Sequence, residues 1–202
     1  LATAIIRAFY DFFDAELPQK DLLFYANFSE NITHGKSSGI DVATVNSEHP
    51  LWFIKDSTIE PFELNLHGFI VIGDTGVHGF TSQAINIVRE KLVEEKEKTQ
   101  DSINHLGQLA TDSKDFLMTD KLKEFGHVMN KAHERLSDLG VSHPRLDNLV
   151  ETARKNGALG AKLTGSGLGG VMVALAENEK DAIRISQRLL KNGAKNTWIY
   201  SF

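Results

Sequence analysis

The order of the apolar segments after residue 67 restricts the fold of this chain more than any other feature of its sequence. The continuous run Phe69-Ile-Val-Ile-Gly73 is rich in β-branched residues, which predicts a buried strand. The predicted strands are 69–73, 161–164, 171–176 and 197–202, and the predicted helices are 81–98, 122–139, 143–156 and 178–192, with one more between 98 and 122. This order predicts an α+β fold. We expect a ferredoxin-like split β-α-β arrangement with extra helices, in which helices cover one face of an antiparallel sheet.

The first 66 residues follow a different pattern. Helices are predicted over 1–15 and 20–33, and short strand-like pieces over Ala43–Asn46, Leu51–Lys55 and Thr58–Leu64. A boundary near residue 66 then divides the chain into domains 1–66 and 67–202. Because Leu1 has no preceding methionine or helix cap and lies in a predicted helix, we expect the chain to be a piece of a longer protein.

Local signals mark several helix ends. Leu17-Pro18 is expected to end the first helix, and Thr81 is the expected N-cap of the helix that runs to about residue 98. His143-Pro144 is expected to open a later helix, and Asn156-Gly157 to close it with a left-handed cap.

Composition excludes several classes of protein and of site. The chain has 202 residues, a net charge of −5 and no cysteine. The negative charge argues against binding of nucleic acid through a broad basic surface. The lack of cysteine excludes disulfides, thiolate zinc sites and cysteine nucleophiles. Since no signal peptide and no apolar run long enough for a membrane span is present, we expect a cytoplasmic protein.

Two carboxylates flank a turn in residues 30–41. Glu30 lies near the end of a predicted helix, and Asp41 follows a turn that contains Ser38 and Gly39. Taken alone, Glu30 is typical of a solvated helix residue, and Asp41 of a residue that caps the element after it. Together they can direct one acid at a metal ion and the other at a hydroxyl group, which phosphoryl transfer to an alcohol requires.

Two glycine-containing stretches imitate nucleotide-binding motifs. Gly165-Ser-Gly-Leu-Gly-Gly170 matches G-x-G-x-x-G, but that fingerprint must open a helix, and a predicted strand follows here. We therefore interpret it as a turn between strands, whose four glycines in six positions indicate close approach to a phosphate or to another loop. Gly35-Lys36-Ser37 lacks the first glycine and the strand of a P-loop. The eight histidines show no metal-ligand spacing.

Four stretches of the sequence carry motifs of one known family. His34–Asp41 is similar to the signature H-G-x-x-S-G-[IL]-D, and Gly73–Thr81 to A-D-T-G-V-x-G-x-T. Gly160–Gly170 is similar to G-A-K-[ML]-[ST]-G-[AG]-G-x-G-G, and Leu1–Phe9 to the helix that follows G-[LM]-G-S-S-A-A. In this combination the chain resembles the mevalonate kinases of the GHMP kinase superfamily, and the motif residues favour the bacterial branch. The resemblance spans nearly the whole chain and implies a GHMP kinase-like fold, with a partial N-terminal domain followed by the C-terminal domain.

The resemblance also implies roles for individual residues. Asp41 takes the place of the catalytic aspartate that orients or deprotonates the 5-hydroxyl of mevalonate, and Glu30 that of the magnesium-binding glutamate. The residues implied near mevalonate are His34, Ser38, Gly39 and Thr81, and those implied at the nucleotide are Gly165, Ser166, Gly167, Gly169 and Gly170. Mg²⁺ is the implied cofactor and ATP the implied co-substrate. A homodimer is compatible with the resemblance.

Some family features differ or are absent. Ser166 stands where alanine or glycine is commoner, and Lys36-Ser37 replaces a frequent Asn-Pro or Thr-Pro. The family's phosphate loop, with its magnesium-binding serine, and its N-terminal lysine would lie upstream of Leu1. We therefore expect these 202 residues alone to be inactive. Two alternatives stay open: a phosphomevalonate, homoserine or sugar kinase, or a non-catalytic relative that binds a ligand.

Overall fold

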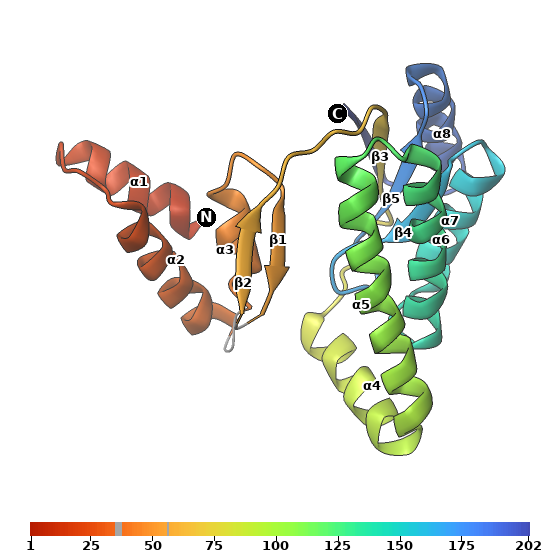
Figure 1. Ribbon diagram of the computed structural model, residues 1–202, viewed down its shortest axis with the longest axis horizontal. Coiled ribbons are helices and arrows are strands. Elements are labelled where there is room, and N and C mark those ends of the chain that lie inside the picture. The colour runs from red at the N-terminus through yellow and green to blue at the C-terminus, as the bar shows by residue number, and fades with distance from the viewer. Residues whose placement is uncertain (35–37, 56) are drawn as a thin grey trace. The chain divides into compact units, whose positions relative to one another are not determined.

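The computed structural model describes residues 1–34, 38–55 and 57–202, which form two compact units (Figure 1). The N-terminal unit comprises Leu1–Leu64 and the C-terminal unit Asn65–Phe202. Within the described ranges, no helix is long and apolar enough to cross a bilayer.

The N-terminal unit consists of a helical part and a β-hairpin. Its elements are α1 (Ala2–Phe12), α2 (Gln19–His34), α3 (Ile40–Val45), β1 (Leu51–Ile54) and β2 (Thr58–Pro61). The hairpin is antiparallel, with Leu51 opposite Pro61 and Ile54 opposite Thr58, so both strands predicted here are confirmed. The first helix ends at Phe12, earlier than predicted, because Asp14 adopts a left-handed conformation with φ 50°.

The prediction of a strand at Ala43–Asn46 is wrong, because this segment forms the second half of α3 and its C-cap. Gly39, with φ 80°, turns the chain into the helix, and Asp41 places a negative charge in its first turn, where the helix dipole favours it. At the other end, the Asn46 side chain donates to Val42 O at 2.7 Å and accepts from Arg7 Nη2 at 3.0 Å. These contacts outweigh the strand preference of the valines and threonine.

The buried side of α2 uses small and aliphatic residues. Leu22 and Ala26 are buried, whereas Ile32 of the same helix is exposed. Several aromatic side chains of this unit are also exposed, namely Phe9, Phe12, Phe13, Phe24 and Phe28. Packing within the unit therefore relies on few side chains.

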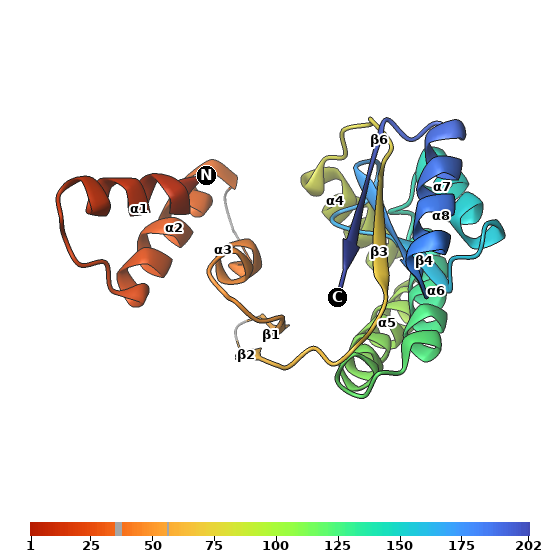
Figure 2. The same cartoon turned by 90° about the horizontal axis from the view of Figure 1, so that it is seen from above.

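The C-terminal unit has the predicted split β-α-β topology. Its elements are β3 (Phe69–Asp74), α4 (Thr81–Glu94), α5 (Lys96–Met118), α6 (Leu122–Asp138), α7 (Pro144–Lys155), β4 (Gly160–Leu163), β5 (Val171–Ala176), α8 (Glu179–Lys191) and β6 (Asn196–Ser201). The strand order is β4-β5-β3-β6, and every neighbouring pair is antiparallel. Helices α7 and α8 cover one face of the sheet, as Figure 2 shows.

The helix predicted from Thr81 to about residue 98 is two helices. Thr81 is the first residue of α4 rather than its N-cap, which is Phe80, and no side-chain cap bond forms there. The chain leaves the helical region at Glu95, with φ −130°, and α5 begins at the next residue. Thr99 Oγ1 donates to Lys91 O at 3.1 Å and stabilises this junction.

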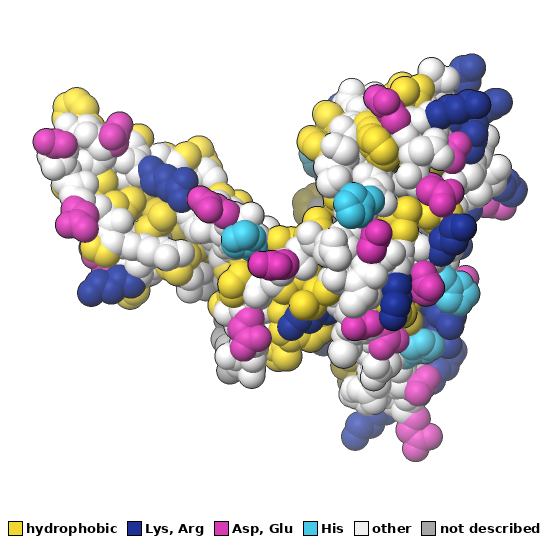
Figure 3. Space-filling model, turned by 45° about the horizontal axis from the view of Figure 1, so that its top comes forward, with side chains coloured by type: hydrophobic (Ala, Val, Ile, Leu, Met, Phe, Trp, Pro, Cys, Tyr) yellow, Lys and Arg dark blue, Asp and Glu magenta, His cyan; other side chains and the backbone are white. Residues whose placement is uncertain are grey.

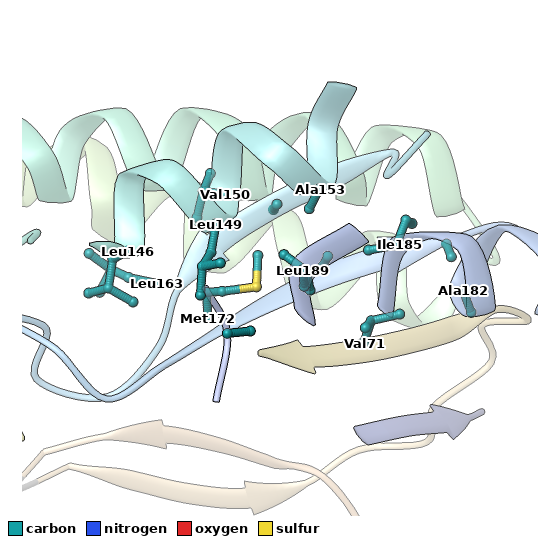
Figure 4. Packing of buried hydrophobic residues seen from close by; sticks show 14 residues of the cluster. Val71, Leu146, Leu149, Val150, Ala153, Leu163, Met172, Ala182, Ile185 and Leu189 are labelled. Atoms are coloured by element: carbon teal, nitrogen blue, oxygen red, sulfur yellow. The ribbon is translucent and has the colours of Figure 1, made fainter. Parts of the chain in front are cut away.

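The start of α7 follows its sequence signals. The His143 side chain accepts a hydrogen bond from Arg145 N, Pro144 stands at the first position, and Gly157 follows the helix with φ 97°. The core lies between the sheet and the helices α7 and α8, where the side chains of both layers point toward one another (Figure 4). Its fully buried members include Val71, Leu149, Met172, Ile185 and Leu189.

Helix α6 covers the edge of the sheet at β4. Asn130 Oδ1 accepts from Ala161 N at 3.0 Å, and His133 Nδ1 accepts from Leu163 N at 3.3 Å. The side chains of α6 thus bind two N–H groups of β4 in place of a neighbouring strand. Because β4 leads directly into residues 165–170, these contacts also fix the start of that loop.

Candidate functional site

The two carboxylates singled out by the sequence both lie in the N-terminal unit. Glu30 is a half-buried residue of α2, and Asp41 is an exposed residue in the first turn of α3. Between the helices, Ser38 Oγ accepts from Ile40 N at 3.4 Å, and Gly39 forms the left-handed N-cap. His34 is the last residue of α2, and Gly35, Lys36 and Ser37 lie outside the described residues.

A cavity of about 430 Å³ opens beside this turn. Ser38 and Gly39 line it together with Asn27 and Asn31 of α2, and the hairpin forms the opposite side. A Cβ on Gly39 would lie 3.5 Å from Asn27 Oδ1. Sequence reasoning missed both asparagines, although their spacing of four residues just around Glu30 places them on one helix face and was available as a signal.

In the C-terminal unit, Gly165–Gly170 forms the glycine-rich loop between β4 and β5, so the interpretation as a turn between strands is confirmed. Five of its six residues have positive φ: Gly165 (75°), Gly167 (79°), Leu168 (59°), Gly169 (137°) and Gly170 (72°). Successive backbone N–H groups in a turn can form a concave site for an anion, but the N–H groups of Leu168 and Gly170 already donate to Val141 O and Val77 O.

The glycines of the loop serve two different purposes. Gly167 and Gly169 are buried, and a Cβ on them would strike Val141 O and Val77 O respectively. A Cβ on Gly165 or Gly170 would meet nothing within 4 Å among the described atoms. The close approach that the sequence predicted is therefore an approach to neighbouring loops at two of the four glycines, and the other two border open space.

Two of the predicted site residues meet at a second cavity. Thr81 and Ser166 line a space of about 360 Å³, whose remaining wall is largely apolar and comes from α4 and Val141. Arg89 is the charged residue in this wall. The structure thus brings the start of α4 and the glycine-rich loop together within one unit.

Buried polar groups surround the start of the loop. Burial lowers the pKa of Lys162, whose Nζ donates to Leu163 O at 2.6 Å. Burial and the charge of Arg154 lower the pKa of His133. Since Nδ1 of His133 accepts from Leu163 N, the neutral ring carries its proton on Nε2, which lies 3.3 Å from Asp147 Oδ1.

No cluster of metal-ligating side chains is found in the described parts of the chain. No three residues among His, Asp and Glu converge there as metal ligands. On the face shown in Figure 3, acidic and basic side chains are interspersed over the C-terminal unit.

Models of one protein family match parts of both units. Residues 1–47 match the family model for the N-terminal domain of GHMP kinases, and residues 114–195 match the model for the GHMP kinase C-terminal region. A mevalonate kinase of Pyrococcus horikoshii is 35% identical over 181 residues, which are 87% of this chain and 53% of that protein.

Solved structures give the same relationship. The crystal structure of L. major mevalonate kinase in complex with R-mevalonate matches with a TM-score of 0.91 and 25% identity, over 99% of this chain and 63% of that one. The mevalonate kinase of methicillin-resistant Staphylococcus aureus matches with a TM-score of 0.75 and 34% identity, over 98% of this chain and 63% of that one. The chain spans about half the length of the curated relatives that it matches, 53% in the case given above.

Proposed function

The chain belongs to the GHMP kinase superfamily, and on this premise we propose that the intact protein transfers the γ-phosphoryl group of ATP to the 5-hydroxyl of mevalonate. The observation that carries the proposal is the pair of carboxylates eleven residues apart, held by α2 and α3 on either side of the Ser38-Gly39 turn. The similarity to mevalonate kinases over most of the chain supports the choice of substrate. In this proposal residues 1–66 are the remainder of the N-terminal kinase domain, and 67–202 are the C-terminal domain.

Asp41 is the proposed catalytic residue. Its carboxylate stands exposed in the first turn of α3, where a substrate has access to it. It accepts a hydrogen bond or the proton from the primary hydroxyl, so that the hydroxyl oxygen lies in line with the terminal phosphorus. The turn residues Ser38 and Gly39 line the adjacent cavity and are proposed contacts to mevalonate. On the family resemblance alone, His34 and Thr81 are proposed contacts as well.

Glu30 is the proposed protein ligand for Mg²⁺. Magnesium in kinase sites is usually held by one or two carboxylates, with phosphate oxygens and water as the remaining ligands. A single half-buried carboxylate on a helix fits that requirement, and a dedicated cage of three or more acidic side chains is not needed. When bound, the ion neutralises charge on the β- and γ-phosphoryl oxygens.

The glycine-rich loop is the proposed contact to ATP, through Gly165, Ser166, Gly167, Gly169 and Gly170. Its Gly165–Ser166 end borders open space and the cavity beside Thr81, whereas the N–H groups of Leu168 and Gly170 already donate to Val141 O and Val77 O. The proposal therefore relies on the backbone N–H groups at the Gly165–Ser166 end. Fixed N–H donors of this kind stabilise phosphoryl charge without reorganisation during the reaction.

We further propose that the intact protein is a cytoplasmic enzyme. A homodimer is an additional hypothesis.

The test measures ADP release by the intact protein with ATP and Mg²⁺, in the presence of mevalonate, phosphomevalonate, homoserine or galactose. We expect turnover with mevalonate alone, and a loss of kcat of about 10²- to 10⁴-fold in Asp41→Asn, because the general base is removed. Asp21→Asn is the matched control, since Asp21 also lies in the first turn of a helix. The 202 residues alone are expected to show no turnover.

Other results of this assay would favour one of the alternative functions. Preference for phosphomevalonate, homoserine or galactose would assign the protein to another branch of the superfamily. Absence of turnover with every acceptor, together with ligand binding that Asp41→Asn leaves intact, would favour a non-catalytic relative.

A further inference from the structure

Thr75 is a buried threonine directly after β3, and its contacts converge on the glycine-rich loop. Its side chain is among the most enclosed polar groups in the described chain, with 1% of its surface exposed. Thr75 Oγ1 donates to Gly170 O at 2.7 Å and accepts from Val77 N at 3.2 Å. The hydroxyl therefore joins the last residue of the loop to the β3–α4 segment (residues 75–80).

Backbone hydrogen bonds reinforce the same junction. Thr75 N donates to Gly170 O at 2.9 Å, and Gly170 N donates to Val77 O at 2.6 Å. Arg145 Nη1 of α7 donates to Thr75 O at 3.3 Å. Both polar groups of the Gly170 backbone are thus bound by the β3–α4 segment, and that segment is in turn held by α7.

The middle of the loop is held by close packing. Leu168 N donates to Val141 O at 2.9 Å, and a Cβ placed on Gly167 would strike the same carbonyl. From the other side, a Cβ on Gly79 would strike Gly167 O. The β3–α4 segment and the turn at Val141 therefore enclose the loop and leave its Gly165–Ser166 end facing open space and the cavity beside Thr81.

We propose that Thr75 is a positioning residue, whose hydroxyl fixes the glycine-rich loop against the segment that carries Thr81. The proposal rests on the proposed function, in which the loop contacts ATP. The β3–α4 segment runs directly into α4, so one buried hydroxyl sets the loop's position relative to the first residue of that helix. Without the hydroxyl, Val77 N–H loses its partner and the loop loses one of the bonds at Gly170.

The experiment compares Thr75→Val and Thr75→Ser in the intact protein. Valine keeps the shape of threonine and removes the hydroxyl, whereas serine keeps the hydroxyl. We expect Thr75→Val to lower kcat/KM for ATP by roughly 10- to 100-fold, the order of loss that follows a small misplacement of binding groups. The loss should appear in the KM for ATP and in kcat, with the KM for mevalonate little changed, and Thr75→Ser should restore activity.

Thr99→Val is the matched control. It also removes a buried threonine hydroxyl that bonds a backbone carbonyl, but at the α4–α5 junction. We expect it to leave kcat/KM unchanged. Amide hydrogen exchange in a peptide covering residues 165–170 gives a readout that does not depend on activity, and exchange there should accelerate in Thr75→Val alone.

Several results would overturn the proposal. One is exchange at residues 165–170 in Thr75→Val that is as slow as in the wild-type protein. The others are a loss of activity in Thr75→Ser, or in Thr99→Val, as large as that in Thr75→Val. If the wild-type protein shows no mevalonate-dependent turnover, the proposed function fails, and the exchange comparison still decides whether Thr75 holds the loop.

Discussion

Two glycines in helix interiors predict opposite effects of the same substitution. Gly126 lies in α6 where the helix meets β4, and a Cβ there would lie 2.7 Å from Leu159 C and 2.8 Å from Leu159 O. Gly107 lies on the exposed side of α5, and a Cβ there would meet nothing within 4 Å among the described atoms. Alanine at Gly126 must push α6 away from backbone atoms, whereas alanine at Gly107 enters solvent.

The magnitudes follow from helix propensity and from packing. Gly→Ala in a helix interior is worth about 0.5–1 kcal/mol when space is free, so Gly107→Ala should stabilise by that amount. Overpacking costs about 1–3 kcal/mol, so Gly126→Ala should destabilise by a net ~1–2 kcal/mol after the propensity gain. The shift also strains the bonds from Asn130 to Leu159 O and Ala161 N that close the sheet edge.

Hydrogen exchange of the slowest amides in the C-terminal unit measures both effects in the intact protein, because these amides exchange through unfolding of the unit. We expect exchange about 2- to 5-fold slower in Gly107→Ala and about 5- to 30-fold faster in Gly126→Ala. If both variants shifted in the same direction, the contact between α6 and β4 would not be the reason for a glycine at position 126.

The other predictions concern the core and the buried histidine. Leu189→Ala should destabilise the C-terminal unit by about 2–5 kcal/mol, since Leu189 is fully buried against the sheet, and denaturant titration would measure the loss. Because the folded pKa of His133 is lowered by burial, the unfolded chain binds this proton more readily. Stability should therefore fall as pH drops below the ordinary histidine value of about 6.5. His133→Gln should make the stability less dependent on pH in that range, and an unchanged pH profile would contradict the assignment.

Much of the C-terminal unit was predictable because its sequence signals agree with its packing. Asn178 caps α8, and the buried residues Ala182, Ile185 and Leu189 follow with helical spacing. The α4–α5 break was missed because the chain near Glu95 is a run of acidic and basic residues that favours a continuous helix. It depends on contacts such as that of Thr99 with Lys91, which no local pattern reports.

The candidate site was likewise predictable only in part. The pattern around Asp41 was visible in the sequence, but the local preference for a strand concealed that this residue lies in the first turn of a helix. That helix depends on Gly39 and on the bond from Arg7 to Asn46. The glycine pattern predicted a close approach at the loop. Only the tertiary structure distinguishes Gly167, packed against Val141, from Gly165, which borders open space.

The most direct measurement is the rate at which intact wild-type protein and its Asp41→Asn variant form ADP, with mevalonate present and with mevalonate omitted. A kinase of the proposed kind forms ADP only when mevalonate is added, and the variant loses at least about 10²-fold of that rate while keeping its affinity for ATP. If the variant formed ADP as fast as the wild type, or if the wild-type rate did not depend on mevalonate, the proposed role of Asp41 would be contradicted.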